Sequence, residues 1–129
     1  MSPAEFIELI SVTRDGIGGH TSNFITVLFA YLVMTYFVAD KLSKFQMWGL
    51  TLIYSAYEFL PARAALQEIQ MLSALLSQFH EQHPAEAGLY IPFGQTNPIP
   101  FAVITAASWG LSVAFMVQRR LWKDDDGVA

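Results

Sequence analysis

The stretch KFQMWGLTLIYSAYEFLPARAALQEIQMLSALLSQFH, residues 44–80, decides the fold of this chain. It reads as one very long helix whose two halves differ in character. The first half carries no charge between Lys44 and Glu58 and is apolar enough to cross a membrane. Its apolar part ends at Leu60 and gives roughly 24 Å of helix, slightly short for a bilayer. The second half is amphipathic, and Pro61 marks the junction.

Apolar residues of the second half repeat with the 3-4-3 spacing of a short coiled-coil fragment. This apolar stripe consists of Ile69, Leu72, Leu76 and Phe79. Good helix formers around it favour a continuous helix, so about 15 residues would project beyond the membrane. The stripe then needs a partner, which could be the N-terminal helix, the loop that follows, or a neighbouring subunit.

The composition indicates an integral membrane protein with an all-α fold. Of the 129 residues, 53% are hydrophobic and 14% are charged, whereas soluble domains carry about 25% charged residues. The apolar residues fall in three blocks separated by polar turns, which favours three spanning helices. The net charge of −4 does not favour nucleic-acid binding, and the absence of cysteine excludes disulfides and thiol chemistry.

Two further segments precede the long helix. Ser2-Pro3-Ala4-Glu5 has the pattern of a capping box with proline at the first helical position, and it predicts a short amphipathic helix over residues 2–12. Three glycines between residues 16 and 19 then favour a turn. Residues 21–40, uncharged from Phe24 to Ala39, predict the first spanning helix. A polar turn at Asp40–Lys44 would make it an antiparallel hairpin with the second helix.

The C-terminal part predicts a loop, a third spanning helix and a tail. Glycines and prolines make residues 81–97 an irregular extracytoplasmic loop, residues 98–121 form the helix, and 122–129 the cytoplasmic tail. Small residues recur at every fourth position of this helix, a pattern that permits close helix packing in lipid. This small-residue ridge consists of Ala102, Ala106, Gly110 and Ala114. It would pack against the first spanning helix or against another subunit.

The basic residues predict the orientation. With three spans, five of the seven Lys and Arg residues share one side: Lys41, Lys44, Arg119, Arg120 and Lys123. Arg14 and Arg63 remain near the other side. The positive-inside rule then places the N-terminus outside and the C-terminus in the cytoplasm. We expect a multi-pass protein of the cell inner (plasma) membrane.

A polar face of the second helix is the main candidate site. It carries Thr51, Tyr54, Ser55 and Glu58, with Arg63 beyond the proline. A carboxylate at membrane depth is costly unless it is paired or protonated, so Glu58 could belong to an ion or proton site or to a pore-lining ring. The structural alternatives are a buried pair with Arg63, or a Glu58 side chain that reaches the interface.

The three histidines are weaker candidates. His20, His80 and His83 all fall on the expected outer side, and histidine with carboxylates can bind zinc or copper. Nothing in the sequence brings His20 near the other two, so we expect solvated histidines and no metal. We also find no nucleophile–base pair and no phosphate-binding loop, and therefore expect neither an enzyme nor a cofactor beyond bound lipid.

Three helices enclose no useful path alone, so we expect association. The first hypothesis is a homo-oligomer with a channel or transport-like role through the polar face of the second helix. The second is a non-catalytic accessory or scaffold subunit of a larger membrane complex, which docks through the apolar stripe and the small-residue ridge. The expected partners are membrane lipids and either copies of this chain or a larger membrane protein.

Overall fold

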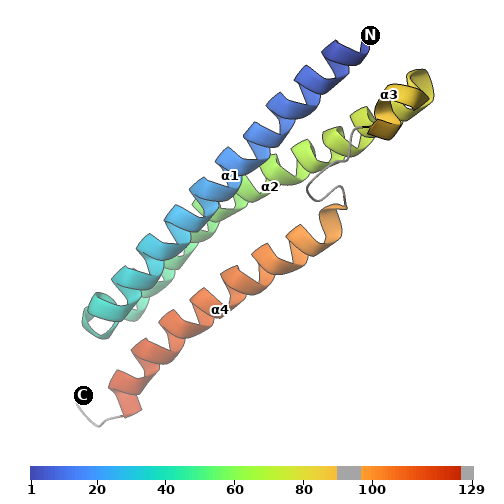
Figure 1. Cartoon of the computed structure of the whole chain (residues 1–129). Helices are drawn as coiled ribbons and strands as arrows, with labels where there is room; N and C mark the ends of the chain where they lie inside the picture. The colour runs from blue at the N-terminus through green and yellow to red at the C-terminus, as the bar shows by residue number, and fades with distance from the viewer. Residues whose placement is uncertain (90–96, 126–129) are drawn as a thin grey trace.

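The computed structural model describes residues 1–89 and 97–125, and every element within these ranges is helical, which agrees with the expected all-α class; residues 84–89, expected to be part of an irregular loop, form a short helix. In chain order the elements are α1 (Pro3–Val38), the short 3-10 helix η1 (Ala39–Lys41), α2 (Lys44–Gln82), α3 (Pro84–Leu89) and α4 (Pro98–Asp125). Figure 1 shows α1 and α2 side by side as a long antiparallel hairpin, with α4 along the part nearest the turn. Residues 90–96 of the expected loop and 126–129 of the tail lie outside the described residues.

The N-terminal region differs from the expectation. The capping box is present, because the Glu5 N–H donates to Ser2 Oγ at 3.3 Å and the Ser2 N–H donates to Glu5 Oε2 at 2.7 Å. The turn after it is absent, since α1 continues without a break through the glycines. Each glycine costs a helix about 1 kcal/mol, and packing against α2 overrides this propensity. The prediction of a separate helix over 2–12 is therefore wrong.

Gly16 shows how a glycine can serve inside this helix. A Cβ added at Gly16 would meet the carboxylate of Glu68 on α2, whereas a Cβ at Gly18 or Gly19 would meet nothing within 4 Å. The missing side chain at Gly16 therefore leaves room for the Glu68 side chain between the two helices. Short-range sequence signals cannot reveal this use, because the partner lies on another helix.

The first half of α1 and the second half of α2 form a two-helix arm (residues 3–20 and 65–82) that extends beyond the start of α4 (Figure 1). Its buried cluster contains Phe6, Ile10, Leu72, Leu76, Phe79 and Ala87. Phe6 of α1 stacks on Phe79 of α2 with ring centroids 5.1 Å apart. The apolar stripe of α2 thus finds its partners inside the chain, in α1 and in Ala87 of α3.

A second buried cluster joins α1, α2 and α4 near the turn. It contains Tyr31, Ala39, Met47, Tyr54 and Met116. At the end of the hairpin, Arg119 donates to the Tyr36 carbonyl at 2.9 Å and Arg120 donates to the Leu42 carbonyl at 2.7 Å. Basic side chains on helix-end carbonyls are favourable, and here they hold α4 against the hairpin.

Much of the apolar surface faces outward. Two helical stretches in the described ranges are long and apolar enough to cross a membrane, Pro3–Lys41 and Pro98–Trp122. Only 22% and 11% of their most apolar segments are buried within the chain, so a protein core does not account for their composition. The first half of α2 is not one of these two stretches. Its apolar side chains Leu52, Phe59 and Leu60 are nevertheless exposed as well.

The small-residue ridge of α4 does not bring α4 close to α1 in this structure. Ala106 and Ala114 are exposed, and a Cβ added at Gly110 would meet nothing within 4 Å. Among the residues of α4 up to position 122, Ser112 and Met116 are buried, and Trp109 packs beside them. Larger side chains fill the space between the helices, so a packing role for the ridge stays a prediction for contacts between chains.

Candidate functional site

The polar face of α2 is turned inward, toward α1 and α4. The Thr51 and Tyr31 hydroxyls are 2.9 Å apart, and the Ser55 hydroxyl donates to the Thr51 carbonyl at 2.7 Å. Ser55 Oγ also accepts from Trp109 Nε1 at 2.9 Å. These hydroxyls therefore bond helices of one chain together.

Tyr54 makes the corresponding link on the same face. Its hydroxyl is 2.8 Å from Ser112 Oγ, and the Ser112 hydroxyl donates to the Trp109 carbonyl at 2.7 Å. Because the Ser112 hydrogen is used in that bond, Tyr54 is the donor to Ser112. The Tyr54 ring also stacks on Tyr31 at a centroid distance of 3.7 Å. One side chain thus contacts both neighbouring helices.

Glu58 lies one turn further along α2, and its carboxyl group has no such partner. The residue is only 1% exposed, and neither carboxyl oxygen forms a hydrogen bond within the described part of the chain. Burying a charge without a partner is very unfavourable, so a carboxyl in this position needs a proton or a cation. Glu58 is therefore the residue whose chemistry the fold leaves incomplete.

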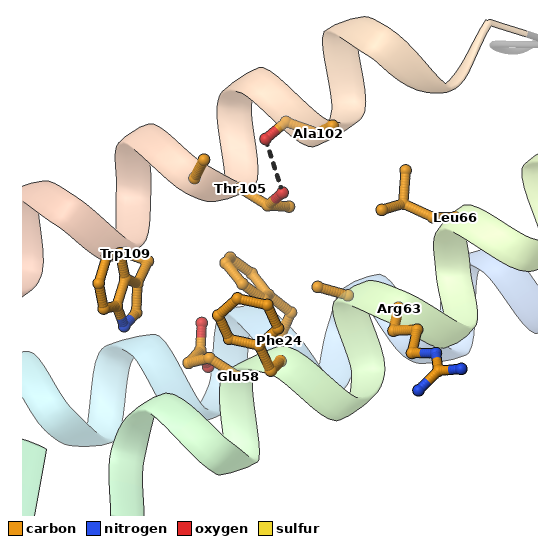
Figure 2. A pocket seen from close by; sticks show the side chains of 10 residues that line it. Phe24, Glu58, Arg63, Leu66, Ala102, Thr105 and Trp109 are labelled. Atoms are coloured by element: carbon orange, nitrogen blue, oxygen red, sulfur yellow. Dashed lines mark hydrogen bonds between the residues drawn. The ribbon is translucent and has the colours of Figure 1, made fainter. Parts of the chain in front are cut away.

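The Glu58 side chain points into a cavity of about 450 Å³ between α2 and α4 (Figure 2). The cavity is closed on one side by Phe24 of α1, and most of its wall is apolar. Its lining residues are Phe24, Glu58, Phe59, Ala62, Arg63, Leu66, Ala102, Thr105, Ala106 and Trp109. Three of these are alanines that face one another across the two helices. These alanines leave open a space between α2 and α4 that larger side chains, such as Tyr54 and Met116, fill nearer the turn.

Arg63 does not neutralise Glu58. It lines the cavity with part of its side chain but is exposed, and Figure 2 shows its guanidinium directed away from the Glu58 carboxyl. The pair that the sequence allowed is therefore not formed. Thr105 also gives no donor, because its hydroxyl donates to the carbonyls of Phe101 and Ala102.

No family model, no curated protein and no solved structure matches this chain. The chemistry of the site therefore has to be derived from its own residues. Of the residues predicted for the polar face, Thr51, Tyr54 and Ser55 form the bonded network, and Glu58 lines the cavity together with part of Arg63.

Phe24 and Trp109 are among the cavity residues that sequence reasoning missed. Trp109 carried a usable signal, since it lies in the middle of an apolar segment, whereas tryptophans of membrane proteins concentrate at the interfaces. Phe24 carried none, because phenylalanine is common throughout the spanning segments. Ala102 and Ala106 were recognised as small residues, but as a packing surface rather than as the wall of a cavity.

The histidines lie apart from the cavity. His20 Nε2 is 3.4 Å from Glu68 Oε1, His80 Nδ1 is 3.1 Å from the Leu76 carbonyl oxygen, and His83 Nε2 is 2.7 Å from the Met1 carbonyl oxygen. Within residues 1–89 and 97–125, no three His, Asp or Glu side chains are arranged to hold a metal ion. The structure therefore brings neither His80 nor His83 to His20.

Proposed function

We propose that this chain is a three-span membrane protein with a transport-like role, in which Glu58 binds and releases a proton or a cation inside the helix bundle. The observation that carries the proposal is the buried Glu58 carboxyl, which faces an apolar cavity and has no hydrogen-bond partner among the described residues. Ionisable residues within spanning segments are rare and commonly mark ion or proton pathways. A purely structural carboxyl would instead have a hydrogen-bond or charge partner.

The apolar exterior supports three spans. α2 runs antiparallel beside α1, so residues 44–62 of α2 lie at the depth of residues 21–40 of α1 (Figure 1). Exposed apolar side chains occur on all three helices at this level, including Phe29 on α1, Leu52 on α2 and Leu111 on α4. Leu52 is 73% exposed and Leu111 72%, which suits contact with lipid rather than water.

The distribution of basic residues supports the orientation. Lys41 and Lys44 flank the end of the hairpin, and Arg119 and Arg120 bond to carbonyls there. The positive-inside rule assigns this end to the cytoplasm and the two-helix arm to the outside of the inner membrane.

The route that we propose for the proton or cation passes through the cavity, since the hydroxyls of the polar face are already bonded within the chain. Self-association would use a surface left uncovered on α4 away from the cavity, such as the exposed Ala114. Such association brings α4 helices together and leaves the polar face of α2 inside each chain.

The test is proton or cation flux in liposomes. The purified protein is reconstituted with a pH-sensitive dye inside the vesicles, and a potassium diffusion potential drives the flux. We expect flux with the wild type and with Glu8→Gln, a matched control at an exposed carboxyl, and loss of flux with Glu58→Gln. Absence of flux in the wild type, or equal flux in Glu58→Gln, would overturn the proposal.

A second candidate function is that of an accessory subunit, and one observation favours it. The two-helix arm exposes apolar side chains although it extends beyond the span, among them Val12 at 63% and Met71 at 54%. Such side chains suit docking to a larger membrane protein. This function predicts that the chain copurifies with a larger partner from native membranes, that Val12→Lys removes the partner, and that Glu58→Gln does not.

A further inference from the structure

We infer that the cavity beside Glu58 binds a lipophilic organic cation, with the Glu58 carboxylate as its counter-ion. The ligand class is an amphiphile whose positive centre is an amine, a quaternary ammonium or a phosphonium group. This inference rests on the proposed function and adds the kind of molecule that the site accepts.

The charges around the cavity favour a cation. Glu58 is the acidic group of the lining, and no described residue forms an ion pair with it. The α1 wall presents Phe24, and the α4 wall presents alanine, threonine and tryptophan, none of which carries a charge. On α2 the ionisable side chains within five residues of Glu58 are Tyr54, the exposed Tyr57, and Arg63, whose guanidinium points away (Figure 2). A cation would remove the cost of the buried carboxylate, whereas an anion would raise it.

The walls favour an organic cation over an inorganic ion. A calcium ion takes about 6–8 oxygen ligands, and this cavity offers one carboxyl group and a threonine hydroxyl that is already bonded. Phe24 and Trp109 present aromatic rings to the cavity, and such rings attract alkylated ammonium groups through cation–π interactions. The bond from Trp109 Nε1 to Ser55 holds the indole in place.

The size and position of the cavity agree with such a ligand. Its volume of about 450 Å³ suits a small organic molecule, since such sites span roughly 300–1,000 Å³. The lining also includes Phe59, 68% exposed, and the exposed Ala106, so the cavity reaches the outer surface between α2 and α4. An amphiphile dissolved in the bilayer can therefore enter from the side. When the cation binds, a protonated Glu58 releases one proton, and the charge in the cavity stays balanced.

The experiment uses the full chain in detergent and two probes of equal shape and opposite charge, tetraphenylphosphonium and tetraphenylborate. Equilibrium dialysis measures binding, and tryptophan fluorescence reports on Trp109 when the other two tryptophans are replaced in a Trp48→Phe, Trp122→Phe variant. We expect saturable binding of tetraphenylphosphonium at one per chain, release of up to one proton per bound probe, and weaker binding as the pH falls. Glu58→Gln should weaken it at least tenfold, Glu8→Gln should leave it unchanged, and Ala106→Phe should block it by filling the cavity. Circular dichroism checks that each variant folds.

Two results would overturn the inference: tetraphenylphosphonium binding that Glu58→Gln leaves unchanged, or equal binding of tetraphenylborate. The outcome is separable from that of the proposed function. If Glu58-dependent proton flux occurs in liposomes and tetraphenylphosphonium does not bind, the transport role stands and the ligand class is wrong. If the probe binds through Glu58 and no flux of protons or probe occurs, the cavity is a binding site and the transport role is wrong.

Discussion

The Tyr54 hydroxyl donates to Ser112 Oγ over 2.8 Å, and this bond ties α2 to α4. The same tyrosine stacks on Tyr31, so it links all three long helices next to the Glu58 cavity. In lipid, helix association depends on van der Waals packing and interhelical hydrogen bonds rather than on the hydrophobic effect. Tyr54 is therefore expected to control how firmly α4 is held.

Tyr54→Phe removes the hydroxyl and keeps the ring stack. We expect a loss of about 1 kcal/mol, in the range measured for hydrogen bonds between membrane helices. Unfolding by denaturing detergent, followed by circular dichroism, measures it. Tyr36→Phe is the control, because Tyr36 is exposed and its hydroxyl takes part in none of the hydrogen bonds described above. Equal stability of the two variants would contradict the role of the Tyr54–Ser112 bond.

Leu72→Lys tests the packing of the two-helix arm. Leu72 is buried between α1 and α2, so the substitution leaves a charge in an apolar cluster and should cost about 3 kcal/mol or more. The neighbouring Ser73 is exposed, and Ser73→Lys should stay within about 0.5 kcal/mol of the wild type. Hydrogen exchange should show faster exchange confined to the arm in Leu72→Lys. If amide exchange in the arm of Leu72→Lys is no faster than in Ser73→Lys, the arm is not held together by this cluster.

Glu58→Leu separates a functional carboxyl from a structural one. Because the carboxyl has no partner in the cavity, its replacement by an apolar side chain should raise the stability by about 1 kcal/mol or more while it abolishes flux and probe binding. A carboxyl engaged in a structural pair would give the opposite sign, a loss of about 3–5 kcal/mol. The thermal midpoint of the purified variant distinguishes the two.

Cysteine labelling tests the number of spans. The chain contains no cysteine, so single introduced cysteines report on one site each. In intact spheroplasts, a membrane-impermeant maleimide should label Gln78→Cys, whereas Asp40→Cys and Gln118→Cys should react only after permeabilisation. All three positions are exposed in the structure. Labelling of positions 40 and 78 from the same side would mean that α2 does not cross the membrane.

The capping box and the apolar stripe were readable from the sequence because each follows a periodic or local rule. Ser2 and Glu5 satisfy each other within one turn, and the spacing of the stripe residues is fixed by helix geometry. The prediction failed at residues 13–19, where glycine propensity favoured a turn and contact with α2 held the helix together. Local preference was weaker there than packing between segments distant in the sequence.

Sequence reasoning singled out Glu58 as a candidate but did not predict the cavity beside it. The cost of a carboxylate at membrane depth made the residue conspicuous, and that argument needs no structure. The cavity depends on three helices at once, on Phe24, Trp109 and the alanines of α4. The spacing of Ala102 and Ala106 was equally compatible with close packing and with an open space, and only the position of α4 separates the two.

The stacking of Phe6 on Phe79 has a consequence for how the protein is made. The two rings come from the first turns of α1 and the last turns of α2, which meet at the open end of the hairpin, so the apolar face of the first turns of α1 is covered only after nearly all of α2 has left the ribosome. Until then Phe6 and Ile10 have no cover from α2. Biogenesis of this chain therefore includes an interval in which a chaperone or the lipid surface has to shield its first helix.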